Sequence, residues 1–222
     1  MSDPIAEDRR LMAVSFMTTE HFVLQGYRGM TINESNGRAG LFLSSLSSAL
    51  VALGFAATAS NFGQSFSVFA LLILPPLAFL GFITFQRTIQ SGIDDALYSR
   101  GINRIRHFYV EMVPEITPYL IRPEFDDRMT AILARSQRRV QWQSFLTIAS
   151  VVGVMNSAVI GAAVGIFVNL PDRPDLPFAL VVGVSVSFVA ALAHAAYQIR
   201  QWKAAFVIFA TMFSPDAPET PA

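Results

Sequence analysis

The fold follows from a long uncharged stretch, AGLFLSSLSSALVALGFAATASNFGQSFSVFALLILPPLAFLGFITFQ, which runs from Ala39 to Gln86. A membrane-spanning helix needs about 20 apolar residues, so this stretch is long enough for two spans. Only the residues NFGQS separate the two apolar parts, which predicts a tight hairpin of helices over 39–60 and 66–86. We expect helices because an open sheet edge would leave backbone groups unpaired in lipid.

A second hairpin is predicted further along the chain. No Asp, Glu, Lys or Arg occurs from Val140 to Pro171 or from Leu176 to Ile199, which predicts spans over 145–168 and 177–197. Of the 222 residues, 53% are hydrophobic and 14% are charged, against about a quarter charged in soluble domains. We therefore predict an all-α, polytopic membrane protein, with four transmembrane helices and helical cytoplasmic extensions.

Basic residues predict the orientation of these spans. Four arginines precede the first span, nine lie in residues 87–144, and Arg200 and Lys203 follow the last span. The turns within the two hairpins carry only Arg173. The positive-inside rule then places both termini and residues 87–144 in the cytoplasm. The N-terminal residues MSDPIAEDRR lack an early apolar core, so we expect no cleaved signal peptide.

The segments between and beside the spans are predicted to be mostly helical. Thr31 and Glu34 have capping-box spacing, which predicts a new helix start just before the first span. The second span is expected to run on as a helix to Met112, with a break near Gly101. A further helix is expected from Glu124. The predicted order is a cytoplasmic amphipathic helix (1–38), hairpin one (39–86), a cytoplasmic helical segment (87–144), hairpin two (145–197), a helical extension (198–213) and a disordered tail (214–222).

The third span carries small residues on one face. Gly153, Ser157, Gly161 and Gly165 follow one another at intervals of four, which is the spacing of one helix face. Such a face lets another helix approach closely, so it favours helix packing, with passage of a ligand as the alternative. Asn156 lies beside this face, and its amide is predicted either to bond a neighbouring helix or to line a pore.

The first span is rich in hydroxyl groups. Ser44 and Ser48 share a face, and Val51 and Phe55 follow them along the helix. Helix packing is one interpretation, because serine can bond back to its own helix. The other is a serine-lined pore entrance that leads to an apolar constriction at Val51 and Phe55.

Residues for catalysis or metal binding are sparse. The chain has no Cys, and its three histidines form no HExxH motif or carboxylate–histidine repeat, although Glu20 and Glu111 lie near His21 and His107 in the sequence. His194 is expected to form hydrogen bonds at the cytoplasmic end of the fourth span. No phosphate-binding loop or nucleophile motif occurs, so we predict no catalytic residue, no cofactor, no metal and no enzymatic activity. A net charge of zero suggests no nucleic-acid partner.

Part of the chain resembles a known group of proteins. The run TTEHFVLQGYRGMTINESNGRAGLFLSSLSSALVALGF, from Thr18 to Phe55, is similar to the opening of uncharacterised bacterial integral membrane proteins, mainly from actinobacteria. The resemblance implies a bacterial inner-membrane protein with four spans. It brings no activity and no functional residues.

Two functions remain open at this point. The first is a homo-oligomeric ion channel or pore, which must form between copies because a single four-helix bundle fills its own centre. The alternative is a non-conducting membrane scaffold or sensor whose cytoplasmic helices bind a soluble partner. Ion-coupled transport is disfavoured, because no ionisable residue is expected deep within a span. The expected partners are the lipid bilayer, further copies of the chain and a cytoplasmic protein.

Overall fold

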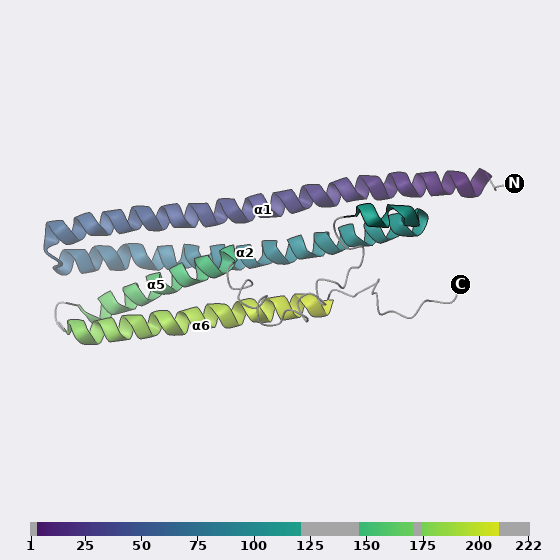
Figure 1. Ribbon diagram of the computed structural model, residues 1–222. Helices are drawn as coiled ribbons and strands as arrows, with labels where there is room; N and C mark the ends of the chain where they lie inside the picture. The colour runs from purple at the N-terminus through teal and green to yellow at the C-terminus, as the bar shows by residue number, and fades with distance from the viewer. Residues whose placement is uncertain (1–3, 121–146, 171–174, 209–222) are drawn as a thin grey trace. The chain divides into compact units, whose positions relative to one another are not determined.

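The computed structural model describes residues 4–120, 147–170 and 175–208, and the regular structure there is helical (Figure 1). Each of the four long helices is long and apolar enough to cross a membrane. This confirms the predicted all-α fold with four candidate spans. The helices are α1 (Pro4–Ser60), α2 (Gln64–Met112), α5 (Ile148–Val168) and α6 (Leu176–Ile208), and a short 3-10 helix, η1 (Pro114–Tyr119), follows α2.

Two of these helices are much longer than a membrane span. α1 has 57 residues and α2 has 49, whereas about 20 are enough to cross the bilayer. The predicted spans of hairpin one therefore occupy the end of α1 and the beginning of α2. α6 has 33 residues, so it extends the fourth span as far as Ile208. The predicted helix from Glu124 and the predicted tail lie outside the described residues.

Two predicted interruptions of these helices are wrong. Thr31 and Glu34 do not start a helix, because α1 runs through both residues. The Thr31 hydroxyl instead donates to the Arg28 carbonyl at 2.9 Å, as hydroxyls within helices commonly do. α2 likewise runs through Gly101 without a break. A Cβ atom there would lie 2.9 Å from Leu24 Cδ1, so this glycine lets α1 approach α2 closely.

The turn between α1 and α2 is short because α1 ends in a Schellman-type cap. The Phe62 N–H bonds to the Ala57 carbonyl at 3.1 Å, and Asn61 has the left-handed backbone with φ 47°. After glycine, asparagine is the usual residue in this position. The Gly63 N–H then bonds to the Ser60 carbonyl at 2.9 Å. The sequence NFG thus ends one helix and starts the next.

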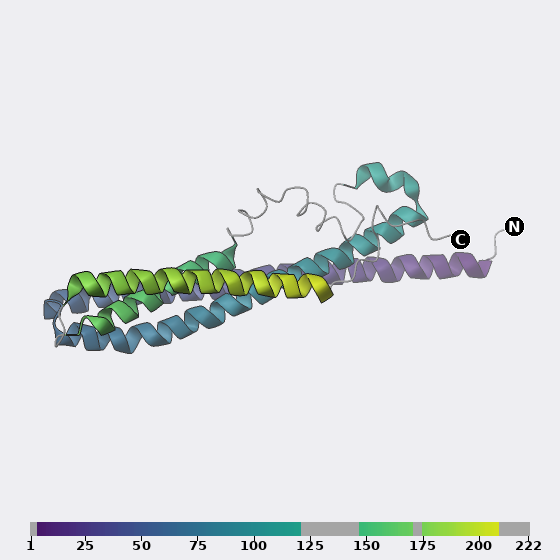
Figure 2. The same cartoon turned by 90° about the horizontal axis from the view of Figure 1, so that it is seen from below.

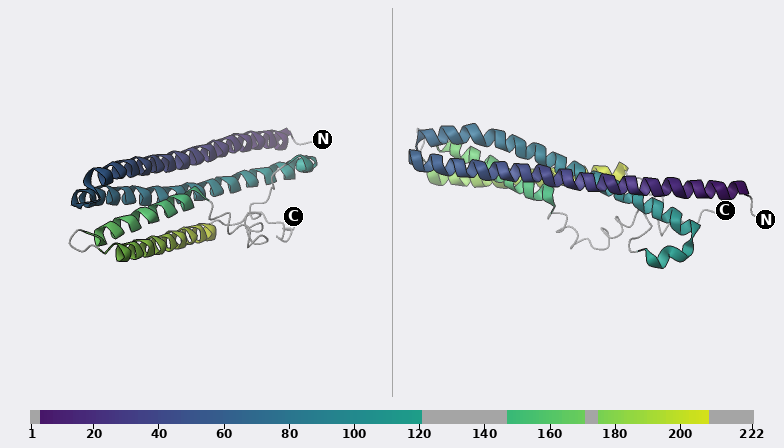
Figure 3. Two further views of the ribbon diagram at one scale, coloured as in Figure 1. Left: turned by 60° about the vertical axis from the view of Figure 1, so that its left-hand side comes forward. Right: turned by 90° about the horizontal axis from the view of Figure 1, so that it is seen from above.

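The helices α5 and α6 both begin at a side-chain cap. The hydroxyl oxygen of Thr147 accepts the Ser150 N–H at 3.3 Å, and Asp175 Oδ1 accepts the Phe178 N–H at 3.1 Å. Each cap satisfies one backbone N–H group that has no partner within its helix. The two helices run antiparallel (Figure 3).

The described chain divides into two units. Unit 1 contains the described residues up to Asn33, those from Gly92 to Leu120, and the end of α6 from Ala205. Here η1 follows a sharp change of chain direction after α2 (Figure 2). Unit 2 contains Glu34–Ser91 and, after the gap, the residues of α5 and α6 up to Ala204. Its core includes Phe42, Phe85 and Val152, which are almost completely buried.

Candidate functional site

Unit 2 contains a buried polar cluster between α5 and α6, which we call the His194 cluster; it consists of Asn156, Ser157 and His194. Asn156 is 0% exposed and Ser157 is 1% exposed, and His194 is partly buried. The Asn156 amide nitrogen lies 3.4 Å from His194 Nε2, and the Ser157 hydroxyl lies 3.2 Å from His194 Nδ1. Two adjacent residues of α5 therefore contact both nitrogens of one imidazole ring.

Backbone carbonyl groups orient the side chains of this cluster. His194 Nδ1 lies 2.7 Å from the Ala190 carbonyl, and the Ser157 hydroxyl donates to the Gly153 carbonyl at 2.7 Å. A carbonyl can only accept, so these contacts assign the proton of a neutral ring to Nδ1. His194 Nε2 is then free to accept a hydrogen bond from the Asn156 amide. The Nδ1 proton faces both the Ala190 carbonyl and the Ser157 hydroxyl oxygen, whose own proton goes to the Gly153 carbonyl.

Helix α2 closes the remaining sides of the cluster. Phe85 meets the His194 ring edge-on with a centroid distance of 4.7 Å. A Cβ atom at Gly81 would overlap the Asn156 side-chain oxygen, so glycine makes room for this amide. The same oxygen is buried and has no hydrogen-bond partner among the described residues. Phe85 and the backbone at Gly81 therefore cover the His194 and Asn156 side chains from the α2 side.

A second layer of polar contacts joins the first turn of α5 to α6. The Ser150 hydroxyl donates to Gln198 Oε1 at 3.2 Å, and the Gln198 amide donates to the Thr147 hydroxyl oxygen at 3.2 Å. On α2, the Gln86 amide donates to the Tyr197 hydroxyl at 3.4 Å. These contacts are between uncharged groups, and they pair polar atoms that would otherwise be costly to bury.

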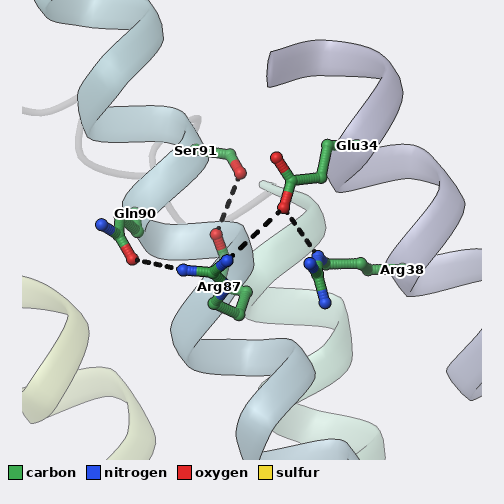
Figure 4. A network of polar contacts seen from close by, with 5 residues as sticks. All are labelled: Glu34, Arg38, Arg87, Gln90 and Ser91. Atoms are coloured by element: carbon green, nitrogen blue, oxygen red, sulfur yellow. Dashed lines mark hydrogen bonds and ion pairs between the residues drawn. The ribbon is translucent and has the colours of Figure 1, made fainter. Parts of the chain in front are cut away.

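Three charged residues of unit 2 lie together on α1 and α2 (Figure 4). Arg38 Nε donates to Glu34 Oε1 at 2.8 Å, and Arg87 Nη2 lies 3.9 Å from the same oxygen. Arg87 also donates to Gln90 Oε1 at 3.2 Å, and the Ser91 hydroxyl donates to the Arg87 carbonyl at 3.0 Å. The charged side chains are between 40% and 49% exposed, so each ion pair contributes about 1 kcal/mol or less.

The small residues predicted on the third span all meet other parts of unit 2. A Cβ atom at Gly161 would overlap the Gly183 carbonyl and the Ser187 hydroxyl of α6. At Gly165 it would lie 3.3 Å from the Ala179 carbonyl, and at Gly153 it would lie 3.1 Å from Phe85 Cε2. With Ser157 in the His194 cluster, the whole face contacts helices of the same chain. Close helix approach of this kind is what small-residue faces provide in membranes.

The pore candidates of the first span lie elsewhere. Ser44, Ser48, Val51 and Phe55 are all exposed on α1, and Phe55 is 74% exposed. The Ser48 hydroxyl donates to the Ser44 carbonyl at 3.0 Å, within its own helix. These residues therefore do not line a path inside unit 2, and Asn156 is buried away from them. Their pore-lining role stays a prediction.

Unit 1 has polar contacts that the sequence reading missed. Arg28 binds Asp95 through two hydrogen bonds, Nε to Oδ1 at 2.7 Å and Nη2 to Oδ2 at 3.2 Å. The rings of Tyr27 and Tyr98 lie 5.5 Å apart. The sequence could have indicated the Arg28–Asp95 pair, because the two residues lie equally far along the chain from the turn at Asn61 and Phe62. In an antiparallel pair of helices, residues at equal distances from a tight turn are neighbours.

His21 in unit 1 is a partly buried ionisable residue. Its Nε2 lies 2.7 Å from the Gln25 amide nitrogen, and its Nδ1 is buried without a partner among the described residues. Partial burial, followed by the positive charge of Arg106, lowers the pKa of His21 below its usual 6.5. The ring therefore favours its neutral form.

The described residues contain no group of three or more His, Asp or Glu side chains placed to hold a metal ion. No protein-family model, curated protein or solved structure matches the chain. Any functional conclusion rests on the residues themselves.

Proposed function

We propose that this protein is a non-conducting membrane scaffold or sensor, whose N-terminal helix binds a soluble partner protein. The observation that carries the proposal is an exposed apolar face on α1 between Leu11 and Met30, ahead of the uncharged stretch. Its members include Leu11, Phe16, Phe22 and Met30, each between 66% and 70% exposed. Contiguous exposed apolar side chains outside a membrane usually mark a protein interface.

The opposite face of this part of α1 is already occupied. Leu24 packs against Gly101, and Arg28 binds Asp95, so the helix is held on α2 through one side. Between Leu11 and Met30 the only acidic or basic residues besides His21 are Glu20 and Arg28. The outer side therefore offers apolar contacts with little charge, which suits the apolar side chains of a partner protein.

The proposal includes the predicted location. With both termini in the cytoplasm of a bacterial cell, the Leu11–Met30 face would meet cytoplasmic proteins, and the bilayer would surround unit 2. No catalytic residue is assigned.

A photo-crosslinking experiment tests this function. A photoreactive phenylalanine at position 16, in cells that express the full chain, should form an adduct with a soluble protein. The same group at position 55, which is equally exposed but lies in the uncharged stretch, should react with lipid only. Adducts at position 16 that contain only a second copy of this chain, or no protein at all, would contradict the scaffold.

A homo-oligomeric channel is the second candidate, and one observation favours it. Ser44 and Ser48 lie on the exposed side of α1, where copies of the chain could face one another across a shared path. Ion flux through liposomes with purified protein distinguishes the two functions. Flux above that of empty liposomes, raised by Phe55→Ser and lowered by Ser44→Leu, would support the channel. Liposomes as tight as empty ones support the scaffold.

A further inference from the structure

Unit 2 contains a cavity of about 840 Å³ between α5, α6 and the beginning of α2. This volume falls within the range of ligand-binding pockets, about 300 to 1,000 Å³. The residues around it are mainly aliphatic, aromatic or glycine. They include Phe62, Phe66, Ala162, Ile166 and Leu180.

The length of the cavity matches one leaflet of a bilayer. Along α6 it runs from Leu176, the first residue of the helix, to Ser187. This distance is about 16 Å at the rise of an α-helix. The hydrocarbon core of a bilayer is about 30 Å thick, so one leaflet accounts for half of it. The cavity thus begins where α6 begins and extends over about half of the length that a membrane span needs.

One polar group in the cavity lacks a partner. Asn169 lines the end of the cavity near Leu176, and its side-chain oxygen Oδ1 is buried without a hydrogen-bond partner among the described residues. A buried carbonyl oxygen without a donor is energetically unfavourable. By contrast, the Ser187 hydroxyl at the deep end donates to the Gly183 carbonyl at 3.0 Å. The deep end is therefore satisfied, and the end near Asn169 needs a donor.

We propose that this cavity binds one acyl chain of a membrane phospholipid, with the polar end of the lipid at Asn169. The apolar lining and the leaflet-long shape suit the hydrocarbon chain. The unpaired amide oxygen suits a headgroup that donates a hydrogen bond, such as the ammonium of phosphatidylethanolamine or a hydroxyl of phosphatidylglycerol. The site is independent of the proposed partner protein, because it lies on different residues in unit 2.

Retention of lipid by the purified full-length protein tests the site. Wild-type protein, washed with mild detergent and analysed by native mass spectrometry, should keep a bound phospholipid. Ala162→Trp fills the cavity and should lose this lipid. Ala193→Trp is the matched control, because Ala193 is exposed on α6 and does not line the cavity, so this variant should keep it.

A second measurement tests the site without Ala162→Trp, in case the bulky side chain disturbs folding. Added phosphatidylethanolamine should raise the Tm of the wild type and of Ala193→Trp, because a ligand stabilises the state that binds it. Phosphatidylcholine has no hydrogen-bond donor in its headgroup, so it should raise the Tm less. Asn169→Leu should abolish this preference while an acyl chain still binds. The Asn169 backbone N–H, which bonds to the Gly165 carbonyl, stays in place.

Three results would overturn the proposal. They are wild-type protein that keeps no lipid, Ala162→Trp protein that keeps as much lipid as Ala193→Trp, and a second copy of the chain found in place of lipid. An absence of crosslinks at position 16 would not affect the lipid result, so the two proposals fail separately.

Discussion

At the scale of single residues, His194 is better explained by its partners than by its position in the sequence. The sequence placed it at the end of a span, as a hydrogen bonder at the interface. In the structure it binds Asn156 and Ser157 within unit 2, beside Phe85. No feature near His194 in the sequence indicates these partners, because they come from another helix. Which residues meet depends on how far α5 and α6 slide along each other.

His21 allows a prediction at the same scale. Its pKa is lowered in the folded protein, so the unfolded chain binds more protons as the pH falls below about 6.5. Stability should therefore be full above this pH and decrease as the pH falls toward the lower folded pKa. Protonation would also place a second donor against the Gln25 amide.

Thermal unfolding in detergent at about pH 8 and about pH 5 measures this effect. His21→Gln should reduce the loss of Tm on acidification. His107→Gln is the control and should leave that loss in place, because it keeps His21 and its contact with Gln25 and removes only the side chain that lies 3.4 Å from Glu111. An unchanged pH dependence in His21→Gln would show that other groups cause it.

At the scale of helices, the contact between α5 and α6 depends on glycines. Gly183 lies opposite Gly161 and Gly165, and a Cβ atom at Gly183 would lie 3.0 Å from the Gly161 carbonyl. The four-residue spacing in α5 indicated a packing face from the sequence alone. It did not indicate the partner helix, since such a face can contact the same chain or another copy.

Replacing Gly161 should show how tight this contact is. Gly161→Ala places a methyl group against the Gly183 carbonyl and Ser187, and overpacking of this kind costs about 1 to 3 kcal/mol. Gly54→Ala is the control, because a Cβ atom at Gly54 has nothing within 4 Å and alanine favours a helix by about 1 kcal/mol. The two variants should shift the Tm in detergent in opposite directions. Equal upward shifts would argue against the close α5–α6 contact.

At the scale of the whole molecule, the topology in the membrane remains a prediction from charge. Because the chain contains no Cys, a single introduced cysteine reports one position. Gln64→Cys, in the turn of hairpin one, should react with an impermeant thiol reagent in intact cells. Glu115→Cys in η1 should react only after the membrane is opened. Both positions are exposed, so burial does not explain a difference. Labelling of Glu115→Cys in intact cells would reverse the predicted orientation.

The sequence by itself determined the all-α class, the four spans and their ends near Ser60 and Gln64, because these depend on local hydropathy and on the turn residues. It also indicated that the second span runs on as a helix to Met112, but it did not reveal that α1 continues unbroken through Thr31 and Glu34. At Thr31 the sequence carries a helix-start signal that the continuous helix does not follow. At Gly101 the packing of Leu24 outweighs the local preference of glycine for a break. Only the tertiary structure decided that Ser44 and Phe55 face outward and that Asn156 and His194 meet. These facts depend on how packed helices are rotated and shifted along each other. Contacts between residues far apart in the chain determine that rotation and shift.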